Sequence, residues 1–207
     1  MNIYYYSLIF QLLCGILPLL IVINRKAVFK TELVIFLLSS VIATIGIFIT
    51  TKFKMYNHYI HNSYLIIEIL CLCQFYFKIF NSKKIKAILF SVTGLLLAIS
   101  ILEVIKIGVM IFSMKIISLC IILISLFYLL NNLMSTSLNH INQPVLLINS
   151  SFIIYHGSSF ILIYFIMNIM SNNLWHFHNF IEGISKLIIA YAFWKLPNET
   201  NFQDSKT

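Results

Sequence analysis

The chain has 207 residues, of which 60% are hydrophobic and only 10% are charged, and its mean hydropathy is +0.96. A water-soluble domain of this length cannot hide so much apolar surface. Long apolar runs separated by short polar links are typical of a polytopic membrane protein. We therefore expect an all-α bundle of membrane-spanning helices, with no catalytic or receiver domain in the water phase.

The formal net charge of +8 comes from Lys and Arg residues that lie mainly in the links between apolar runs. This placement indicates membrane topology, so nucleic acid is not an expected partner. The four cysteines lie inside apolar runs, and we interpret them as small packing residues rather than disulfides or zinc ligands. They are Cys14, Cys71, Cys73 and Cys120.

Seven apolar runs approach the roughly 20 residues that a membrane-spanning helix needs. They cover about 4–23, 33–51, 60–80, 86–102, 116–134, 149–170 and 174–195. The stretch 103–115, before the fifth run, is either a surface helix or an extension of that span. We expect one domain over residues 1–196 and a short polar tail, 197–207, that is disordered.

The distribution of basic residues predicts the orientation of the spans. The links after the first, third and seventh runs hold nine of them: Arg25, Lys26, Lys30, Lys78, Lys83, Lys84, Lys86, Lys195 and Lys206. The links after the second and fourth runs hold four: Lys52, Lys54, Lys106 and Lys115. Because the excess belongs on the cytoplasmic side, we expect the N-terminus outside and the C-terminus in the cytoplasm, in the cytoplasmic (inner) membrane.

Two spans carry ionisable residues at helical spacing. His178, Glu182 and Lys186 follow one another at four-residue intervals in the seventh run, and His61 and Glu68 are seven apart in the third. Both spacings place the side chains on one helix face. Lys186 lies roughly 14 Å from either end of its run at ~1.5 Å per residue, which is too far for its side chain to reach the interface.

A charge at the centre of a bilayer is costly, by about 2.5–3.5 kcal/mol on insertion scales, so such groups face the bundle interior and pair. Glu182 is the expected partner of Lys186. If the third and seventh spans are neighbours, their five ionisable residues form one intramembrane polar pocket. Asn149, His156 and Ser159 share a face of the sixth span and predict a secondary polar track.

These residues also have a structural interpretation, because amide, hydroxyl and imidazole groups often hydrogen-bond between spans. We interpret Asn62, Asn179 and His156 in this way. The acids and the lysine fit that explanation less well, since a charge costs more than an amide. An ionisable group inside a membrane is by default a hypothesis of function.

The leading functional interpretation is a ligand-sensing or membrane-partner-regulating protein, with a signalling or accessory role and no predicted cofactor. Its expected partners are the lipid bilayer and a membrane protein or a small lipophilic ligand. One alternative is a metal-dependent hydrolase of lipid-like substrates, with zinc held by His61, His178, Glu68 and Glu182, although the sequence has no strong ligand spacing. The other is a small transporter or proton pathway.

The predicted topology can be tested with reporter fusions. A reporter that is active only in the cytoplasm, fused after Thr207, is expected to be active, because the basic links place the C-terminus inside. The matched control is a reporter that is active only outside, fused at the same position, which is expected to be silent. The reverse pattern would contradict the orientation.

Overall fold

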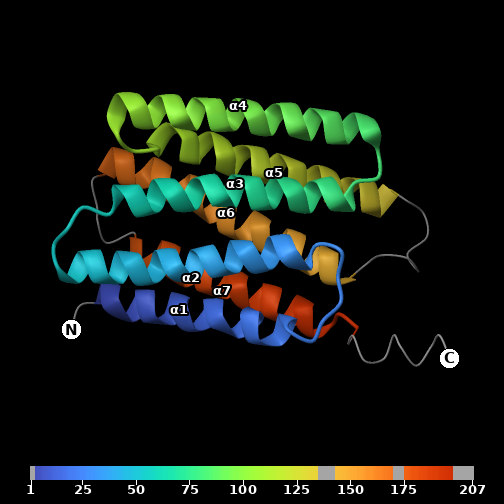
Figure 1. Ribbon diagram of the computed structural model, residues 1–207, viewed down its shortest axis with the longest axis horizontal. Helices are drawn as coiled ribbons and strands as arrows, with labels where there is room; N and C mark the ends of the chain where they lie inside the picture. The colour runs from blue at the N-terminus through green and yellow to red at the C-terminus, as the bar shows by residue number, and fades with distance from the viewer. Residues whose placement is uncertain (1–2, 135–142, 170–174, 198–207) are drawn as a thin grey trace. The chain divides into compact units, whose positions relative to one another are not determined.

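A computed structural model of the chain describes residues 3–134, 143–169 and 175–197. Over these ranges the protein is all-helical (Figure 1). Its helices are α1 (Ile3–Val22), α2 (Lys30–Lys52), α3 (His58–Ile79), α4 (Lys83–Ile107), α5 (Ile111–Met134), α6 (Gln143–Ile169) and α7 (Trp175–Trp194). Most of the tail predicted for 197–207 lies outside the described residues.

Six of the described helices, α1 to α6, are long and apolar enough to cross a membrane. Helix α7 is not among them, although a span was expected at 174–195. The cause is its composition, since two histidines, an asparagine, a glutamate and a lysine lower its mean hydropathy.

The stretch 103–115 is neither a separate surface helix nor a simple extension of the fifth span. It continues α4 to Ile107, turns, and begins α5 at Ile111. Gly108 ends α4 with a φ of 83°, a left-handed conformation that a residue with a side chain rarely adopts. The carboxylate of Glu103 accepts the backbone N–H groups of Phe112 and Ser113 at 2.6 and 2.7 Å and so caps the start of α5.

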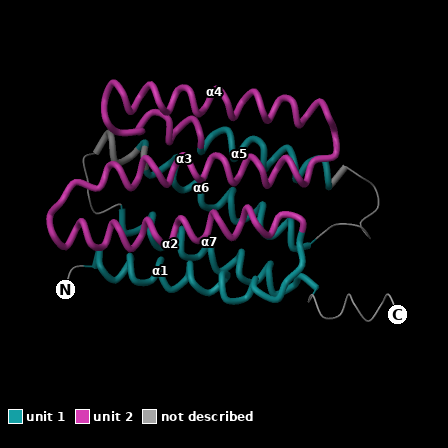
Figure 2. The backbone as a smooth tube through the Cα atoms, viewed as in Figure 1, with its two compact units in different colours: residues 1–27, 118–207 teal, residues 28–117 magenta. Residues whose placement is uncertain are grey.

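The chain forms two compact units (Figure 2). Unit 1 contains residues 1–27 and 118–207, and unit 2 contains residues 28–117. Helix α5 begins in unit 2 and continues in unit 1. Each unit is described here through its own contacts.

In unit 2, α3 packs against both α2 and α4. At one end of α3, Lys78 Nζ lies 2.7 Å from Glu32 Oε1 of α2 and donates to the carbonyl of Val28. At the other end, the amide of Asn62 donates to Gly108 O at 2.8 Å and accepts from Met110 N at 3.2 Å. Asn62 therefore holds the turn between α4 and α5.

In unit 1, α7 packs against both α1 and α6. Asn179, near the start of α7, donates to Ser7 Oγ near the start of α1 at 3.0 Å. Just past the ends of the two helices, Arg25 donates to the carbonyl of Leu196 at 2.8 Å. The first and last helices of the chain are therefore parallel neighbours.

Close packing of α1 against α7 depends on Gly183. A Cβ atom at this position would lie 2.5 Å from Cε1 of Phe10 and 3.5 Å from Sγ of Cys14. Because the Phe10 ring would have to move, a side chain at residue 183 pushes the two helices apart.

We expect Gly183→Ala to lower the free energy of unfolding by roughly 1–3 kcal/mol, the usual range for overpacking. The measurement is a denaturant titration of the purified protein. Gly157→Ala in α6 is the matched control, because its new Cβ would meet no atom of the described residues within 4 Å beyond its chain neighbours and the nearby backbone of its own helix. Equal stability of the two variants would contradict this account of the α1–α7 contact.

Candidate functional site

The site centres on a buried ion pair within α7. Lys186 Nζ lies 2.7 Å from Glu182 Oε1, and the two residues are only 2% and 5% exposed. Their four-residue spacing places the ammonium one helical turn after the carboxylate, which is the favourable order for such a pair. Apart from this ion pair, Nζ has no hydrogen-bond acceptor among the described residues.

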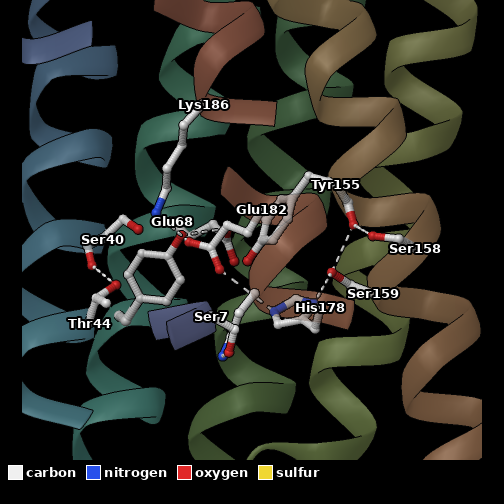
Figure 3. Close-up of polar contacts among 12 residues, drawn as sticks. Ser7, Ser40, Thr44, Glu68, Tyr155, Ser158, Ser159, His178, Glu182 and Lys186 are labelled. Atoms are coloured by element: carbon white, nitrogen blue, oxygen red, sulfur yellow. Dashed lines mark hydrogen bonds and ion pairs between the residues drawn. The ribbon is translucent and has the colours of Figure 1, made fainter. Parts of the chain in front are cut away.

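Further neighbours of the Glu182 carboxylate come from α7 itself and from α1. Its Oε2 atom lies 3.7 Å from Nε2 of His178, one turn earlier on the same helix. The amide of Gln11, on α1, donates a hydrogen bond to the same carboxylate. The carboxylate therefore contacts a cation, an imidazole and an amide, and two of the three come from its own helix (Figure 3).

Residues of α6 also contact His178. Ser159 Oγ lies 3.4 Å from His178 Nδ1, and the rings of Tyr155 and His178 are 5.6 Å apart. His156 is 1% exposed and lies close enough to His178 and Glu182 to interact electrostatically with both. Its Nε2 atom is buried without a hydrogen-bond partner in the described part of the chain.

The secondary track predicted along α6 divides into two parts. Ser159 and His156 lie beside the ionic residues of α7. Asn149, which is seven residues before His156 and so roughly 10 Å away along the helix, instead donates to the carbonyl of Ser125 in α5 at 2.9 Å. Asn149 therefore joins α5 to α6 at this point of the helix.

His61 and Glu68 belong to unit 2, whereas His178, Glu182 and Lys186 belong to unit 1. Glu68 is 2% exposed, and within its own unit its Oε1 accepts a hydrogen bond from the hydroxyl of Tyr64 at 3.2 Å. The five-residue pocket therefore stays a prediction. The contacts among His178, Glu182 and Lys186 do not depend on that pocket.

Two residues of α1 were missed in the sequence. Gln11 contacts Glu182, and Ser7 accepts from Asn179. Both are polar residues within an otherwise apolar run, and Gln11 is the only amide inside α1. The sequence shows these polar residues, but their partners depend on α1 lying beside α7, and residue spacing within one helix does not reveal which helices are neighbours.

The described residues contain no group of three or more His, Cys, Asp or Glu side chains placed to hold a metal ion. Within unit 1 the candidate ligands are reduced to His178 and Glu182, and the nearby ammonium of Lys186 already neutralises the carboxylate.

The arrangement has a definite chemical capacity. With Lys186 charged, Glu182 ionised and the histidines neutral, the cluster carries no net charge. Among the described residues, Nε2 of His156 is buried without a hydrogen-bond partner, and Nζ of Lys186 has the Glu182 carboxylate as its one acceptor. Such atoms cost free energy where they lie buried, and a bound group or a proton can relieve that cost.

A comparison of the chain with known protein families, with curated proteins and with solved structures finds no match. The candidate site therefore rests on the geometry of the chain itself.

The ion pair predicts a strong energetic coupling. Glu182→Gln leaves a buried ammonium unpaired, and we expect it to destabilise the protein by about 3–5 kcal/mol. Adding Lys186→Leu should restore much of that loss, because the double variant buries no charge. The measurement is a double-mutant cycle on the free energy of unfolding.

The pair Glu32–Lys78 is the matched control for this cycle. Its side chains are 15% and 32% exposed, so its coupling should be much smaller, about 0–1 kcal/mol. Additive effects of the Glu182 and Lys186 substitutions would contradict the pairing.

Proposed function

We propose that the chain is a seven-span protein of the cytoplasmic membrane whose buried ionic site on α7 senses a lipophilic ligand or regulates a membrane-protein partner. In this proposal the N-terminus is outside and the C-terminus is in the cytoplasm. Support comes from the six apolar helices and from the excess of basic residues in alternate links. The parallel direction of α1 and α7 also fits, because two odd-numbered spans must run the same way.

The observation that carries the functional proposal is the buried Glu182–Lys186 pair. A well-packed apolar pair is often at least as stable as a buried ion pair of similar volume. Stability is therefore a weak reason for a chain to keep two charges inside an apolar helix. A site that must respond to another molecule is a stronger one.

The same geometry suggests how a response would arise. Lys186 has one ionic partner and no other hydrogen-bond acceptor among the described residues. A group that competes for Glu182 would leave the ammonium in need of a new partner and so favour a different packing of α7 against α1 and α6. A ligand shifts such an equilibrium only by its difference in affinity for the two arrangements.

The links between the described helices of unit 2 are short, which favours output through contacts inside the membrane. They are residues 53–57, 80–82 and 108–110. We therefore assign the protein a regulatory rather than a catalytic role, with a membrane partner receiving the change in α7.

The proposal can be tested in the native membrane. A photo-reactive amino acid at Ile184, which is 47% exposed on α7, should cross-link a membrane protein, or the protein purified with lipid should release a bound lipophilic molecule on extraction. We expect at least one of these products to be lost in Glu182→Gln/Lys186→Leu, which removes both charges without leaving one unpaired.

A cross-linker at Phe90 of α4, which is 76% exposed, reports nonspecific membrane neighbours and should be unaffected by the double substitution. Far-UV circular dichroism and gel filtration establish that the double variant is folded. Identical products from the folded variant and the unmodified protein would contradict the proposal.

A further inference from the structure

The hydrogen bonds of Ser159 determine where its hydroxyl hydrogen lies. Ser159 Oγ is 2.8 Å from the carbonyl oxygen of Tyr155. A carbonyl can only accept, so the hydroxyl must donate its single hydrogen to Tyr155. In its contact with His178, Ser159 therefore acts as an acceptor.

From this assignment we infer the tautomer of His178. The atom that faces Ser159 Oγ at 3.4 Å is Nδ1, and it must carry a hydrogen in order to donate. A neutral imidazole has only one N–H group, so Nε2 then has a lone pair and no hydrogen. That lone pair faces Glu182 Oε2 across 3.7 Å (Figure 3).

Two acceptors that face each other in a low-dielectric interior repel, unless a hydrogen lies between them. We propose that the gap between His178 Nε2 and Glu182 Oε2 is a proton-binding site, and that a proton bound there is a signal that acts on the proposed sensing site. The identification of the proton as the signal rests on the proposed sensing function, whereas the binding site rests on the geometry alone.

The binding step involves one proton and no other group. A proton from water forms an N–H bond with the lone pair of His178 Nε2, and the imidazole becomes an imidazolium. The new N–H group points toward Glu182 Oε2, where a short movement of either side chain closes the 3.7 Å gap to hydrogen-bond distance.

The charges around the gap make this proton exchangeable. Burial of the ring opposes the imidazolium, as does the ammonium of Lys186, whereas the carboxylate of Glu182 favours it. Neutral His156 offers another nitrogen nearby. Within unit 1 the titratable or charged groups facing the gap or its charged partners are Glu182 and Lys186 on α7, Tyr155 and His156 on α6, and Cys14 on α1.

Proton binding would change the ion pair. Glu182 then interacts with two cations, the imidazolium of His178 and the ammonium of Lys186, so its interaction with Lys186 becomes weaker. Because Nζ has no other hydrogen-bond acceptor in the described residues, a weakened pair leaves the ammonium free to seek a new one. The proton would thus act on the same contact that the proposed function places at the centre of sensing.

The test is a nitrogen NMR spectrum of the full chain, labelled with ¹⁵N-histidine and held in lipid nanodiscs. Spectra are recorded across roughly pH 5 to 8, where histidine commonly exchanges its proton. His178→Gln identifies the signals of His178. We expect hydrogen on Nδ1 alone at the high end of this range and on both ring nitrogens at the low end. Hydrogen on Nε2 alone, or signals that do not change with pH, would overturn the proposal.

The chain offers a matched pair of variants for the tautomer. Ser158 and Ser159 both donate to the carbonyl of Tyr155 at 2.8 Å, but only Ser159 has a contact with His178. Ser159→Ala should abolish the preference for hydrogen on Nδ1, and Ser158→Ala should preserve it. An unchanged preference in Ser159→Ala would overturn the assignment.

Glu182→Gln should lose the doubly protonated His178 signal, because the carboxylate that stabilises the imidazolium is gone. Persistence of that signal in the variant would contradict a proton held between the two residues. If Glu182→Gln does not fold, the spectra of the unmodified protein and of the two serine variants still test the proton-binding proposal.

Cross-linking from Ile184 at both ends of the pH range separates the proton site from the sensing function. A His178 that gains a proton without any change in cross-links supports the site and contradicts its role in sensing. A His178 that never changes, in a protein whose cross-links still depend on Glu182 and Lys186, overturns the proton site and leaves the proposed function supported.

Discussion

The ion pair between Glu182 and Lys186 is the constraint on which the rest of unit 1 depends. A carboxylate and an ammonium buried in the middle of a helix are stable only when they are paired. Helix α7 therefore needs neighbours on its polar face, and it has α1 and α6. The glycine at 183, one residue after the carboxylate, lets α1 approach closely enough to bring Gln11 to that carboxylate.

The two units hold their helices together by different means. In unit 2, polar groups act at the helix ends: Glu103 caps α5 and Asn62 holds the turn before it. In unit 1, contacts at the helix ends, Asn179 with Ser7 and Arg25 with Leu196, are joined by the ionic pair in the middle of α7. A polar group at a helix end satisfies backbone atoms that the helix leaves unpaired. The Glu182–Lys186 pair instead neutralises two charges within one helix.

The imidazole of His178 connects the structural and the chemical parts of the site. Its position between Ser159 and Glu182 follows from the packing of α6 on α7, and its tautomer follows from the hydroxyl direction of its neighbour. A change in the protonation of this one ring would alter the balance of charge around Lys186. Packing and chemistry are therefore linked through a single carboxylate that interacts with two bases.

The sequence by itself determined the all-helical class, the approximate apolar runs and the helix face shared by His178, Glu182 and Lys186, because hydropathy and helical spacing are local properties. It did not reveal the turn at Gly108, which depends on the Glu103 and Asn62 contacts. Nor did it show that Gln11 meets Glu182, that Ser159 lies beside His178, or that Asn149 bonds to α5. Those facts depend on which helices are neighbours and how each is rotated, and only the tertiary structure decides that.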